Sequence, residues 1–395
     1  MLSAFHPMKV GVLSETLPGE RRVALIPDVA GKLTQSGFEV VLEAGAGELA
    51  DFIDEAYRRV GVSIEADRWA LLSTADFVLS VQPPRLEDVA RLHAGAATIS
   101  FLQPATQAAL VEALAERGVT AFSLDLLPRT SRAQSMDALS SQSSLGGYKA
   151  VLMAANRLGK FFPMLITAAG TVPPARMLVL GAGVAGLQAI ATARRLGAVV
   201  EAYDVRSAVQ EEVQSLGARF LELKLETQES QGGYAHEQSE QFLTRQRELL
   251  TEHVAGVDVV ITTASIPGQR APLLVTAPMV KGMRRGSVIV DLASESGGNC
   301  ELTRPGQVIE VDGIWIDGTA NIPSTMALHA SQLYSRNVSN LLQFLVRDGE
   351  LKLDFKDEIT RDCCVTHAGQ IVNERARQLM EATTTQKIAQ TEVRL

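Results

Sequence analysis

The feature that most constrains the fold of this chain is the stretch at residues 178–205, LVLGAGVAGLQAIATARRLGAVVEAYDV. An apolar run ends at Gly181, and Gly183 and Gly186 complete a GxGxxG spacing before a helical stretch and a second apolar run. The first glycine permits a tight turn, the second lets the backbone approach a pyrophosphate, and the third lets helix and strand pack closely. A glycine turn without a ligand is the simpler alternative, but the complete strand–helix–strand pattern favours a dinucleotide site.

The second apolar run ends in an acidic residue, which discriminates between dinucleotides. Asp204 lies 18 positions after Gly186, where a carboxylate accepts hydrogen bonds from the adenosine ribose hydroxyls and repels the 2′-phosphate of NADP(H). Arg206 could pair with that phosphate, yet Asp204 precedes it and favours NAD(H). The residues predicted to contact the cofactor here are Gly181, Gly183, Val184, Ala185, Gly186, Asp204, Val205 and Arg206.

Two later loops follow apolar runs and are expected to reach the same site. Residues 262–268, TTASIPG, and residues 291–302, DLASESGGNCEL, come directly after or at the end of predicted strands. In open α/β sheets, ligands bind beyond the carboxyl ends of the strands. We therefore predict further cofactor contacts, against the alternative of ordinary turns, from Thr263, Ala264, Pro267 and Glu295.

The order of β-rich and helical runs sets the fold class. Strands are predicted within residues 9–15, 38–44, 76–81, 97–102 and 119–125, and again within 176–181, 198–204, 218–224, 257–263 and 286–292, in a second alternating block that runs to residue 317. This alternation, in a chain of 395 residues, predicts an α/β protein with two Rossmann-like, doubly wound parallel-sheet domains and a cofactor cleft between them. Late helical patterns, including a helical tail at 358–380, are expected to return to the first domain. The predicted domains are 1–140 with 326–395, and 141–325.

The composition excludes several partners. A formal net charge of −8 disfavours direct binding to nucleic acid or anionic lipid. The longest uncharged runs, at residues 161–175 and 177–193, are shorter than the roughly 20 apolar residues that span a bilayer, and the first residues lack a secretory pattern. Cys300, Cys363 and Cys364 lack metal-ligand spacing, which indicates buried reduced thiols in a cytosolic protein.

No side chain stands out as a general acid or base. An NAD-dependent enzyme that acts on an alcohol, amine or hydroxy acid usually needs a proton donor or acceptor of suitable pKa. None of the 6 histidines stands at a predicted strand end beside a glycine-rich or acidic neighbour, and the lysines are no more convincing. A reaction that moves no proton therefore has to be considered.

Several segments together resemble a known family. They include GERRVALIPD, RTSRAQSMDALSSQSSLGGYKAV, FFPMLITAAGTVPPARMLVLGAGVAGLQAIATARRLGA and MVKGMRRGSVIVDLASESGGNC. From about residue 9 to about residue 378 the chain resembles the NAD(H)-binding component of proton-translocating nicotinamide nucleotide transhydrogenase. The resemblance implies a transhydrogenase of the Re/Si-specific type that is active only with partner subunits.

The resemblance also implies the partners and the location. In that family this component is a homodimer, and it is expected to be cytoplasmic and peripheral on the inner face of the cytoplasmic membrane. It presents NADH to an NADP(H)-binding component, and both sit on a membrane-spanning component that carries the proton channel. An apolar hairpin predicted at residues 162–176 would be exchanged between the two subunits.

Alanine dehydrogenase shares this fold and is the first alternative. Its pattern has a lysine in a VKEP-like strand end and a histidine in an FLH-like one, which bind and protonate the oxo acid. The matching stretches here are SVQPP and SFLQPA, with Gln82 and Gln103. Glutamine does not titrate, so neither residue can act as general acid or bind a carboxylate by charge. A non-catalytic NAD(H)-binding module is the second alternative.

The resemblance assigns a role to the loop RTSRAQSMD. In the family this loop holds the nicotinamide ring and its ribose, and the matching residues are Arg129, Gln134 and Asp137, followed by Ser140. The residue chemistry agrees, because Gln134 offers the donor and acceptor that a carboxamide needs, and Asp137 with Arg129 can brace the loop. A further loop carries Tyr234, whose counterpart in the family closes over the bound nucleotide. The alternatives are a solvated surface loop and a loop without a role.

Overall fold

The chain forms two compact units. The computed structural model describes residues 7–222, 240–265 and 269–382. Unit 1 comprises Met1–Gln142 with Ser324–Leu395, and unit 2 comprises Ser143–Pro323. Each unit has its own sheet and core, so each is described separately.

The sheet of unit 1 has the strand order β19-β18-β6-β5-β4-β1-β2-β3. Strands β1 to β6 pair in parallel, and β18 and β19 extend the β6 edge in antiparallel orientation. The strands are β1 (Lys9–Val12), β2 (Glu39–Glu43), β3 (Ser63–Glu65), β4 (Phe77–Leu79), β5 (Ala97–Ser100), β6 (Thr120–Ser123), β18 (Cys364–His367) and β19 (Gln370–Ile371). The five strands predicted in this region are confirmed, and the short β3 is an addition.

The C-terminal tail shows that the prediction of a helical segment at residues 358–380 was wrong. Only α12 (Glu358–Cys363) and residues 374–382 are helical, and the chain between them forms β18 and β19. Val365 and Thr366 in β18 are fully buried beside β6. Their β-branched side chains suit a strand, but the deciding factor is the edge of β6, which this segment covers and which no local pattern reveals.

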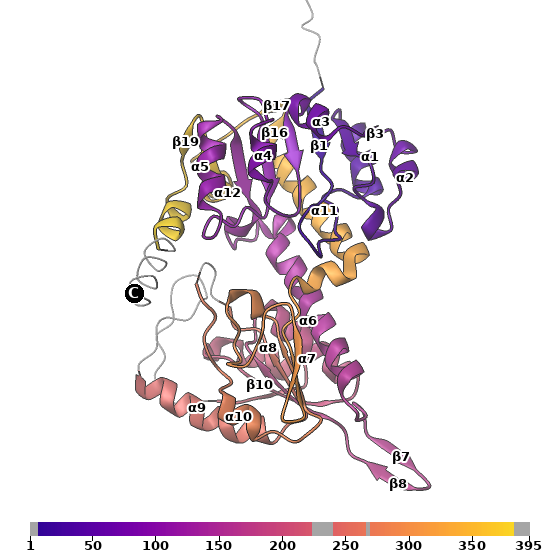
Figure 1. Cartoon of the computed structure of the whole chain (residues 1–395), viewed down its shortest axis with the longest axis vertical. Coiled ribbons are helices and arrows are strands. Elements are labelled where there is room, and N and C mark those ends of the chain that lie inside the picture. Colours follow the sequence, from indigo (N-terminus) through magenta and orange to yellow (C-terminus); the bar gives the residue numbers. More distant parts are fainter. Residues whose placement is uncertain (1–6, 223–239, 266–268, 383–395) are drawn as a thin grey trace, which may run out of the picture. The chain divides into compact units, whose positions relative to one another are not determined.

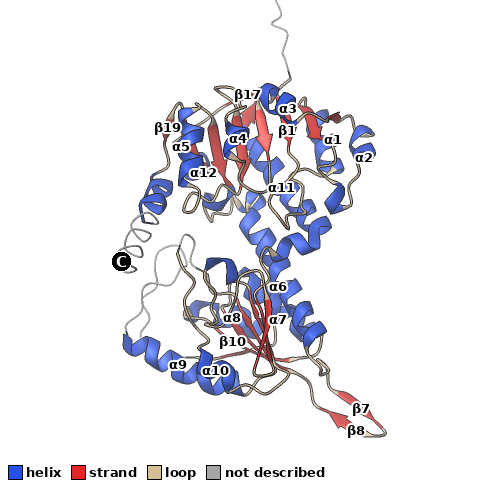
Figure 2. Ribbon diagram, viewed as in Figure 1, coloured by secondary structure: helices blue, strands red, loops and turns tan. Residues whose placement is uncertain are grey.

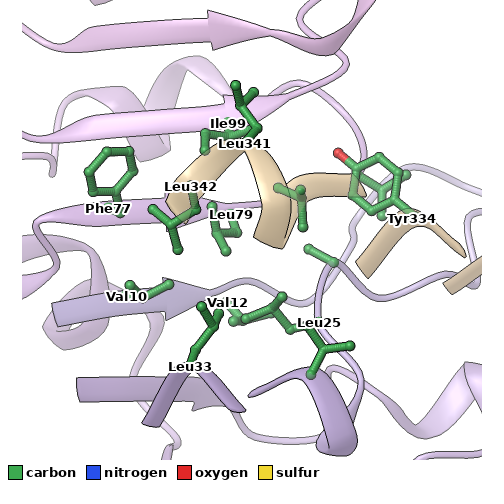
Figure 3. Packing of buried hydrophobic residues seen from close by; sticks show 14 of the residues in the cluster. Val10, Val12, Leu25, Leu33, Phe77, Leu79, Ile99, Tyr334, Leu341 and Leu342 are labelled. Atoms are coloured by element: carbon green, nitrogen blue, oxygen red, sulfur yellow. The ribbon is translucent and has the colours of Figure 1, made fainter. Parts of the chain in front are cut away.

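Helices cover both faces of the unit 1 sheet. On one face α1 and α11 pack against strand residues, and Figure 3 shows Leu33 of α1 and Leu341 of α11 beside Val10, Leu79 and Ile99. On the other face lie α3, α4 and α5. Because α11 comes from late in the chain, unit 1 is discontinuous. The bounds in this unit are α1 (Pro27–Gln35), α2 (Asp54–Arg58), α3 (Arg68–Thr74), α4 (Leu86–Val89), α5 (Ala108–Glu116) and α11 (Ala327–Leu345), with a small ribbon of β16 (Val346–Arg347) and β17 (Glu350–Leu351).

The sheet of unit 2 has the order β11-β10-β9-β12-β13-β15-β14, parallel except for β14. Its strands are β9 (Arg176–Leu180), β10 (Val199–Tyr203), β11 (Arg219–Phe220), β12 (Val259–Thr262), β13 (Val288–Asp291), β14 (Val308–Val311) and β15 (Ile314–Asp317). The five predicted strands are confirmed as β9 to β13, β15 lies at the predicted end of the alternating block, and β14 was not expected. The strand order reverses at β9, which lies between β10 and β12. The carboxyl end of β9 is therefore the switch point where such sheets bind ligands.

Helices also cover both faces of this sheet. The helices α6 (Ala138–Arg157), α7 (Val184–Arg195) and α8 (Gln210–Ser215) pack on one face, and α9 (Glu240–Ala255) and α10 (Ala277–Lys281) on the other. Figure 1 shows α6 beside α7, and a Cβ on Gly147 of α6 would lie 2.0 Å from the carbonyl oxygen of Ala185 in α7. The small residues of α6 thus allow its backbone to approach that of α7.

One ribbon of unit 2 stands apart from its sheet. The predicted apolar hairpin is confirmed as β7 (Leu165–Thr167) and β8 (Gly170–Val172), which projects from the unit in Figure 2. Ile166 at its centre is 73% exposed. With two doubly wound, mainly parallel sheets, the predicted α/β class is confirmed. Across the described segments of the chain, no helix has both the length and the apolar character needed to span a membrane.

Candidate dinucleotide-binding site

The glycine turn after β9 is shaped by backbone atoms that lie too close together for a side chain. Gly181 has a φ of +101°, which glycine tolerates, and its N–H donates to the carbonyl oxygen of Tyr203 at 2.8 Å. A Cβ on Gly186 would lie 1.9 Å from the carbonyl oxygen of Gly181. Both positions therefore require glycine, as the motif predicts.

The second glycine of the motif lies at the open end of the turn. Gly183 is the N-cap of α7, and a Cβ there would meet no atom within 4 Å. Val184, the first residue of α7, is 40% exposed, and Ala185 follows it. The N–H groups of a first helical turn have no acceptor within their own helix, so this end of α7 can bind an anionic pyrophosphate.

The acidic residue at the end of β10 is bonded to the same turn. Asp204 Oδ2 accepts a hydrogen bond from Ala182 N at 2.7 Å. The guanidinium of Arg206 donates to Asp204 through Nε and Nη2, each at 3.0 Å. Because Asp204 neutralises Arg206, the pair offers no net positive charge to a 2′-phosphate, which agrees with the prediction of NAD(H). A ribose diol would donate hydrogen bonds to the same carboxylate that accepts from Arg206. Val205, which lies between Asp204 and Arg206 in the sequence, is partly buried.

The loops after β12 and β13 lie at the same edge of the sheet. Thr263 Oγ1 donates to the carbonyl oxygen of Gly181 at 3.0 Å, and Ala264 is hydrogen-bonded to Asn299. Glu295 is exposed, and its Oε2 accepts a hydrogen bond from Asn321 N at 2.9 Å. The structure thus brings Thr263 against the glycine turn. The predicted residues Tyr234 and Pro267 lie outside the described residues.

In unit 1 the loop RTSRAQSMD presents an exposed glutamine. Gln134 lies in a short 3₁₀ turn and is exposed, as is Arg129. Asp137 accepts hydrogen bonds from Ser140 N at 2.9 Å and Ser140 Oγ at 2.5 Å, so it caps the start of α6. The structure thus brings together Asp137 and Ser140, while a brace between Asp137 and Arg129 stays a prediction.

The same loop is held from the far end of the chain. The carbonyl oxygen of Ser135 accepts hydrogen bonds from Asn337 Nδ2 at 2.9 Å and Asn340 Nδ2 at 3.0 Å, both on α11. Arg132 forms an ion pair with Asp357 at 2.6 Å. These contacts fix the backbone on the side of the loop that faces α11.

The carboxyl edge of the unit 1 sheet carries a bonded polar cluster. Arg22 donates to Glu20 through Nε at 2.8 Å and Nη2 at 2.6 Å, and through Nη1 to Gln142 at 3.0 Å. Gln82 Nε2 donates to Glu20 at 2.7 Å, and Gln103 Nε2 reaches Gln82 at 3.4 Å. Burial opposes the charge on Glu20, but the hydrogen bonds and charge of Arg22 outweigh it and lower the pKa of Glu20 to about 2. The guanidinium of Arg22 at this edge is therefore already paired with the carboxylate of Glu20.

A second carboxyl group at this edge behaves differently. Glu15 follows β1 and accepts hydrogen bonds from Val81 N at 2.5 Å and Gln82 N at 3.2 Å. Burial, with a smaller contribution from the charge of Glu20, raises the pKa of Glu15 to about 8. Two carboxyl groups five positions apart thus have pKa values shifted in opposite directions.

Three of the candidate histidines have structural contacts. His93, His253 and His367 bond to backbone carbonyl groups, to Glu201 and to Thr120 respectively. In the ranges that the structure covers, no group of His, Cys, Asp or Glu could hold a metal ion. The three cysteines are buried and free, as their spacing indicated.

Sequence reasoning missed the side chains that hold the site loops in place. Asn337 and Asn340 lie in an amphipathic helix with nothing in the local pattern to mark them. Asn299 directly follows the glycine pair of SGGNC, which was a usable signal, since an amide after a turn often bonds to neighbouring backbone.

A GxGxxG turn lies at the switch point of a parallel sheet, and an acidic residue stands at the end of the next strand. These features define the Rossmann dinucleotide-binding class, here in a protein of two domains. Sequence profiles agree: residues 11–146 match "Alanine dehydrogenase/PNT, N-terminal domain" and residues 150–374 match "Alanine dehydrogenase/PNT, C-terminal domain". The chain belongs to the alanine dehydrogenase/PNT family.

Similar proteins separate the two branches of this family. The chain is 47% identical over 376 residues to an NAD(P) transhydrogenase alpha-subunit chain of Rhodospirillum rubrum, and the match covers 93% of this chain and 98% of that protein. The crystal structure of transhydrogenase from Sinorhizobium meliloti is 42% identical with a TM-score of 0.82, covering 93% of this chain and 99% of that one. Alanine dehydrogenase of Halomonas elongata is 32% identical, covering 82% and 84%. Within the family, the chain groups with the transhydrogenase alpha subunits.

Proposed function

We propose that this chain is the NAD(H)-binding component of a proton-translocating transhydrogenase, in which a hydride passes directly between NADH on this chain and NADP⁺ on a partner component. The carboxyl edge of the unit 1 sheet carries the proposal. Gln82 and Gln103 stand where the alanine dehydrogenase pattern has a lysine and a histidine, and Arg22 is paired with Glu20. The two glutamines supply neither a cation nor a general acid for an oxo acid.

Direct hydride transfer between two nicotinamide rings moves no proton, but it needs the donor ring in one pose. By the family resemblance, Arg129, Gln134, Asp137 and Ser140 hold the nicotinamide and its ribose. The exposed amide of Gln134 can pair with the ring carboxamide, and the Asp137 cap fixes the start of α6 beside it. The glycine turn with Asp204, Val205 and Arg206 holds the pyrophosphate and adenosine, with support from Thr263, Ala264, Pro267 and Glu295, and Tyr234 closes over the nucleotide.

The same proposal includes the partners. A homodimer would cover the exposed apolar side chains along the hairpin, Phe161, Met164 and Ile166. The other partners are an NADP(H)-binding component and a membrane-spanning component that carries protons, which places this chain in the cytoplasm, peripheral on the inner face of the cytoplasmic membrane. No nucleic acid is involved, in keeping with the net charge of −8.

Incubation of the purified chain with NADH and a panel of 2-oxo acids, with and without ammonium, tests the reaction. We expect NADH to bind without being oxidised, and hydride transfer to a thio-NADP⁺ analogue to begin when the NADP(H)-binding component is added. Rapid oxidation by one oxo acid would make the chain an amino-acid dehydrogenase. Binding of NADH without transfer to the partner-bound nucleotide would favour a non-catalytic NAD(H)-binding module.

A further inference from the structure

We propose that Asn299 is a positioning residue of the dinucleotide site, which holds the loop after β12 against the glycine turn. The inference rests on the proposed binding of NAD(H) at that turn and adds a residue outside the glycine motif. Asn299 is fully buried. Its side chain makes three hydrogen bonds to the neighbouring loop: Oδ1 accepts from Ala264 N at 3.0 Å, and Nδ2 donates to the carbonyl oxygens of Ala264 and Pro272, each at 2.8 Å.

The backbone of Asn299 is itself fixed by a buried carboxylate. Asp291, at the carboxyl end of β13, is fully buried and accepts from Asn299 N at 2.9 Å. It also accepts from Thr262 Oγ1 at 2.8 Å, Thr303 Oγ1 at 2.7 Å and Cys300 N at 3.1 Å. A buried carboxylate with several donors is a rigid anchor, because each lost bond leaves charge without compensation. Asp291 therefore supports the site through Asn299.

The loop that Asn299 holds is in direct contact with the glycine turn. Thr263 precedes Ala264, and its Oγ1 donates to the carbonyl oxygen of Gly181 at 3.0 Å. A Cβ on Gly181 would lie 2.5 Å from the same Oγ1, so the contact is close enough to transmit a displacement. A shift of Ala264 therefore moves the atoms on which the Gly181 turn rests. The chain of contacts runs from Asp291 through Asn299 and Thr263 to the pyrophosphate turn.

The amide of Asn299 is suited to this task by its mixed hydrogen-bonding capacity. It satisfies both the N–H and the carbonyl oxygen of Ala264, which an ionised carboxylate could not do, since a carboxylate only accepts. Asn299→Ala would leave these backbone groups, together with Pro272 O, without their protein partner. Asn299→Asp keeps the size and the bond from Ala264 N, but it places negative charge against two carbonyl oxygens.

Asn373 in unit 1 provides a matched control. It is also buried, and its side chain accepts one hydrogen bond, from Ala376 N at 2.8 Å, and donates two, to Arg361 O at 3.2 Å and Asp362 O at 2.8 Å. Asn373→Ala therefore removes the same number and kind of bonds at a place that carries no proposed cofactor contact. A loss of affinity caused by general destabilisation would appear in both variants.

The test is equilibrium binding of NADH and of ADP-ribose to the full chain, at a temperature where circular dichroism shows every variant folded. We expect Asn299→Ala to weaken both ligands by a similar factor, about tenfold, because both carry the pyrophosphate and adenosine. We expect Asn373→Ala to change neither affinity. In Asn299→Ala, assayed with the partner components, kcat at saturating NADH should fall much less than kcat/KM.

Unchanged affinities in Asn299→Ala, or an equal loss in Asn373→Ala, would overturn the positioning role. If Asn299→Ala does not fold, Asn299→Asp takes its place with the same expectation and the same contradicting outcomes. Failure of the wild-type chain to bind either ligand would instead contradict the proposed function, so the two failures are distinguishable.

Discussion

The two regions proposed to hold the cofactor are built by opposite means. In unit 2 the glycine turn is shaped by its own backbone, with Gly186 so close to the carbonyl oxygen of Gly181 that a side chain is excluded. In unit 1 the loop RTSRAQSMD is held by side chains from more than 200 positions away, since Asn337 and Asn340 grip the carbonyl oxygen of Ser135. The first region resists change at a few glycines, whereas the second depends on distant amides.

This difference has consequences for how each region responds to mutation. Backbone contacts cannot relax without moving whole elements, so an added atom in unit 2 should be costly. Side-chain hydrogen bonds to a partly exposed loop can be replaced by hydrogen bonds to water. Their loss in unit 1 should therefore lower the unfolding free energy less, and should mainly affect how well the loop RTSRAQSMD is ordered. Three predictions test this contrast, beginning with the largest expected effect.

The largest effect is expected where α6 meets α7. Gly147→Ala would place a Cβ 2.0 Å from the carbonyl oxygen of Ala185, one position before Gly186. We expect a loss of about 3 kcal/mol in the free energy of unfolding and weaker NADH binding, measured by urea denaturation and by titration. Gly146→Ala is the neighbouring control, because a Cβ there would meet nothing within 4 Å. It should stabilise the protein by about 0.5–1 kcal/mol, since alanine favours a helix over glycine. Equal effects of the two changes would contradict the close backbone contact.

An intermediate effect is expected from the amides that hold the loop. The double change Asn337→Ala with Asn340→Ala removes both hydrogen-bond donors to Ser135 O. Each lost hydrogen bond should lower the free energy of unfolding by about 1 kcal/mol. NADH affinity should fall several-fold while ADP-ribose affinity stays the same, because ADP-ribose lacks the nicotinamide that this loop is proposed to hold. Gln343→Ala on the same helix is the control, since Gln343 bonds only to Ser339 among the contacts resolved for it. A parallel loss of ADP-ribose affinity would show that the loop does not act on the nicotinamide end.

The smallest effect concerns the dependence of the unfolding free energy on pH. It comes from a difference between two carboxyl groups, Asp291 at the edge of the unit 2 sheet and Glu15 at the edge of the unit 1 sheet. Asp291 in unit 2 has several donors, whereas Glu15 in unit 1 has two backbone donors and a pKa raised by burial from 4.5 to about 8. The folded chain therefore binds the Glu15 proton more tightly than the unfolded chain, and this contribution to stability is present below pH 4.5 and lost as pH rises toward 8.

Glu15→Gln removes this dependence. The difference in unfolding free energy between Glu15→Gln and wild type should shift in favour of the variant by about 1 kcal/mol between pH 5 and pH 6. Urea denaturation of both proteins at the two pH values measures it, and other titrating groups cancel in the difference. A constant difference across this range would mean that Glu15 has an ordinary pKa.

The sequence was informative wherever the constraint is local. Gly181 and Gly186 could be predicted because a tight turn and a close helix–strand contact each need a missing Cβ, and Gly183 because the motif brings the backbone there close to a pyrophosphate. The buried parallel strands were predicted because both of their faces are covered, which makes them apolar along their length. Gln82 and Gln103 were equally readable, since the residue type alone removes charge and titration from the edge of the unit 1 sheet.

The tertiary structure decided what depends on contacts between distant segments. The segment Cys364–His367 became a strand because β6 offered it an edge, so the predicted helical tail was wrong. Asn299 and Asn337 became anchors because folding brought them beside Ala264 and Ser135, and an amide can bond to any backbone group it meets. The sequence by itself determined which residues can form a dinucleotide turn, because the absence of a Cβ is a property of the residue type and does not depend on the fold. Only the fold decided which side chains hold the site, because hydrogen-bond partners are chosen by proximity in space.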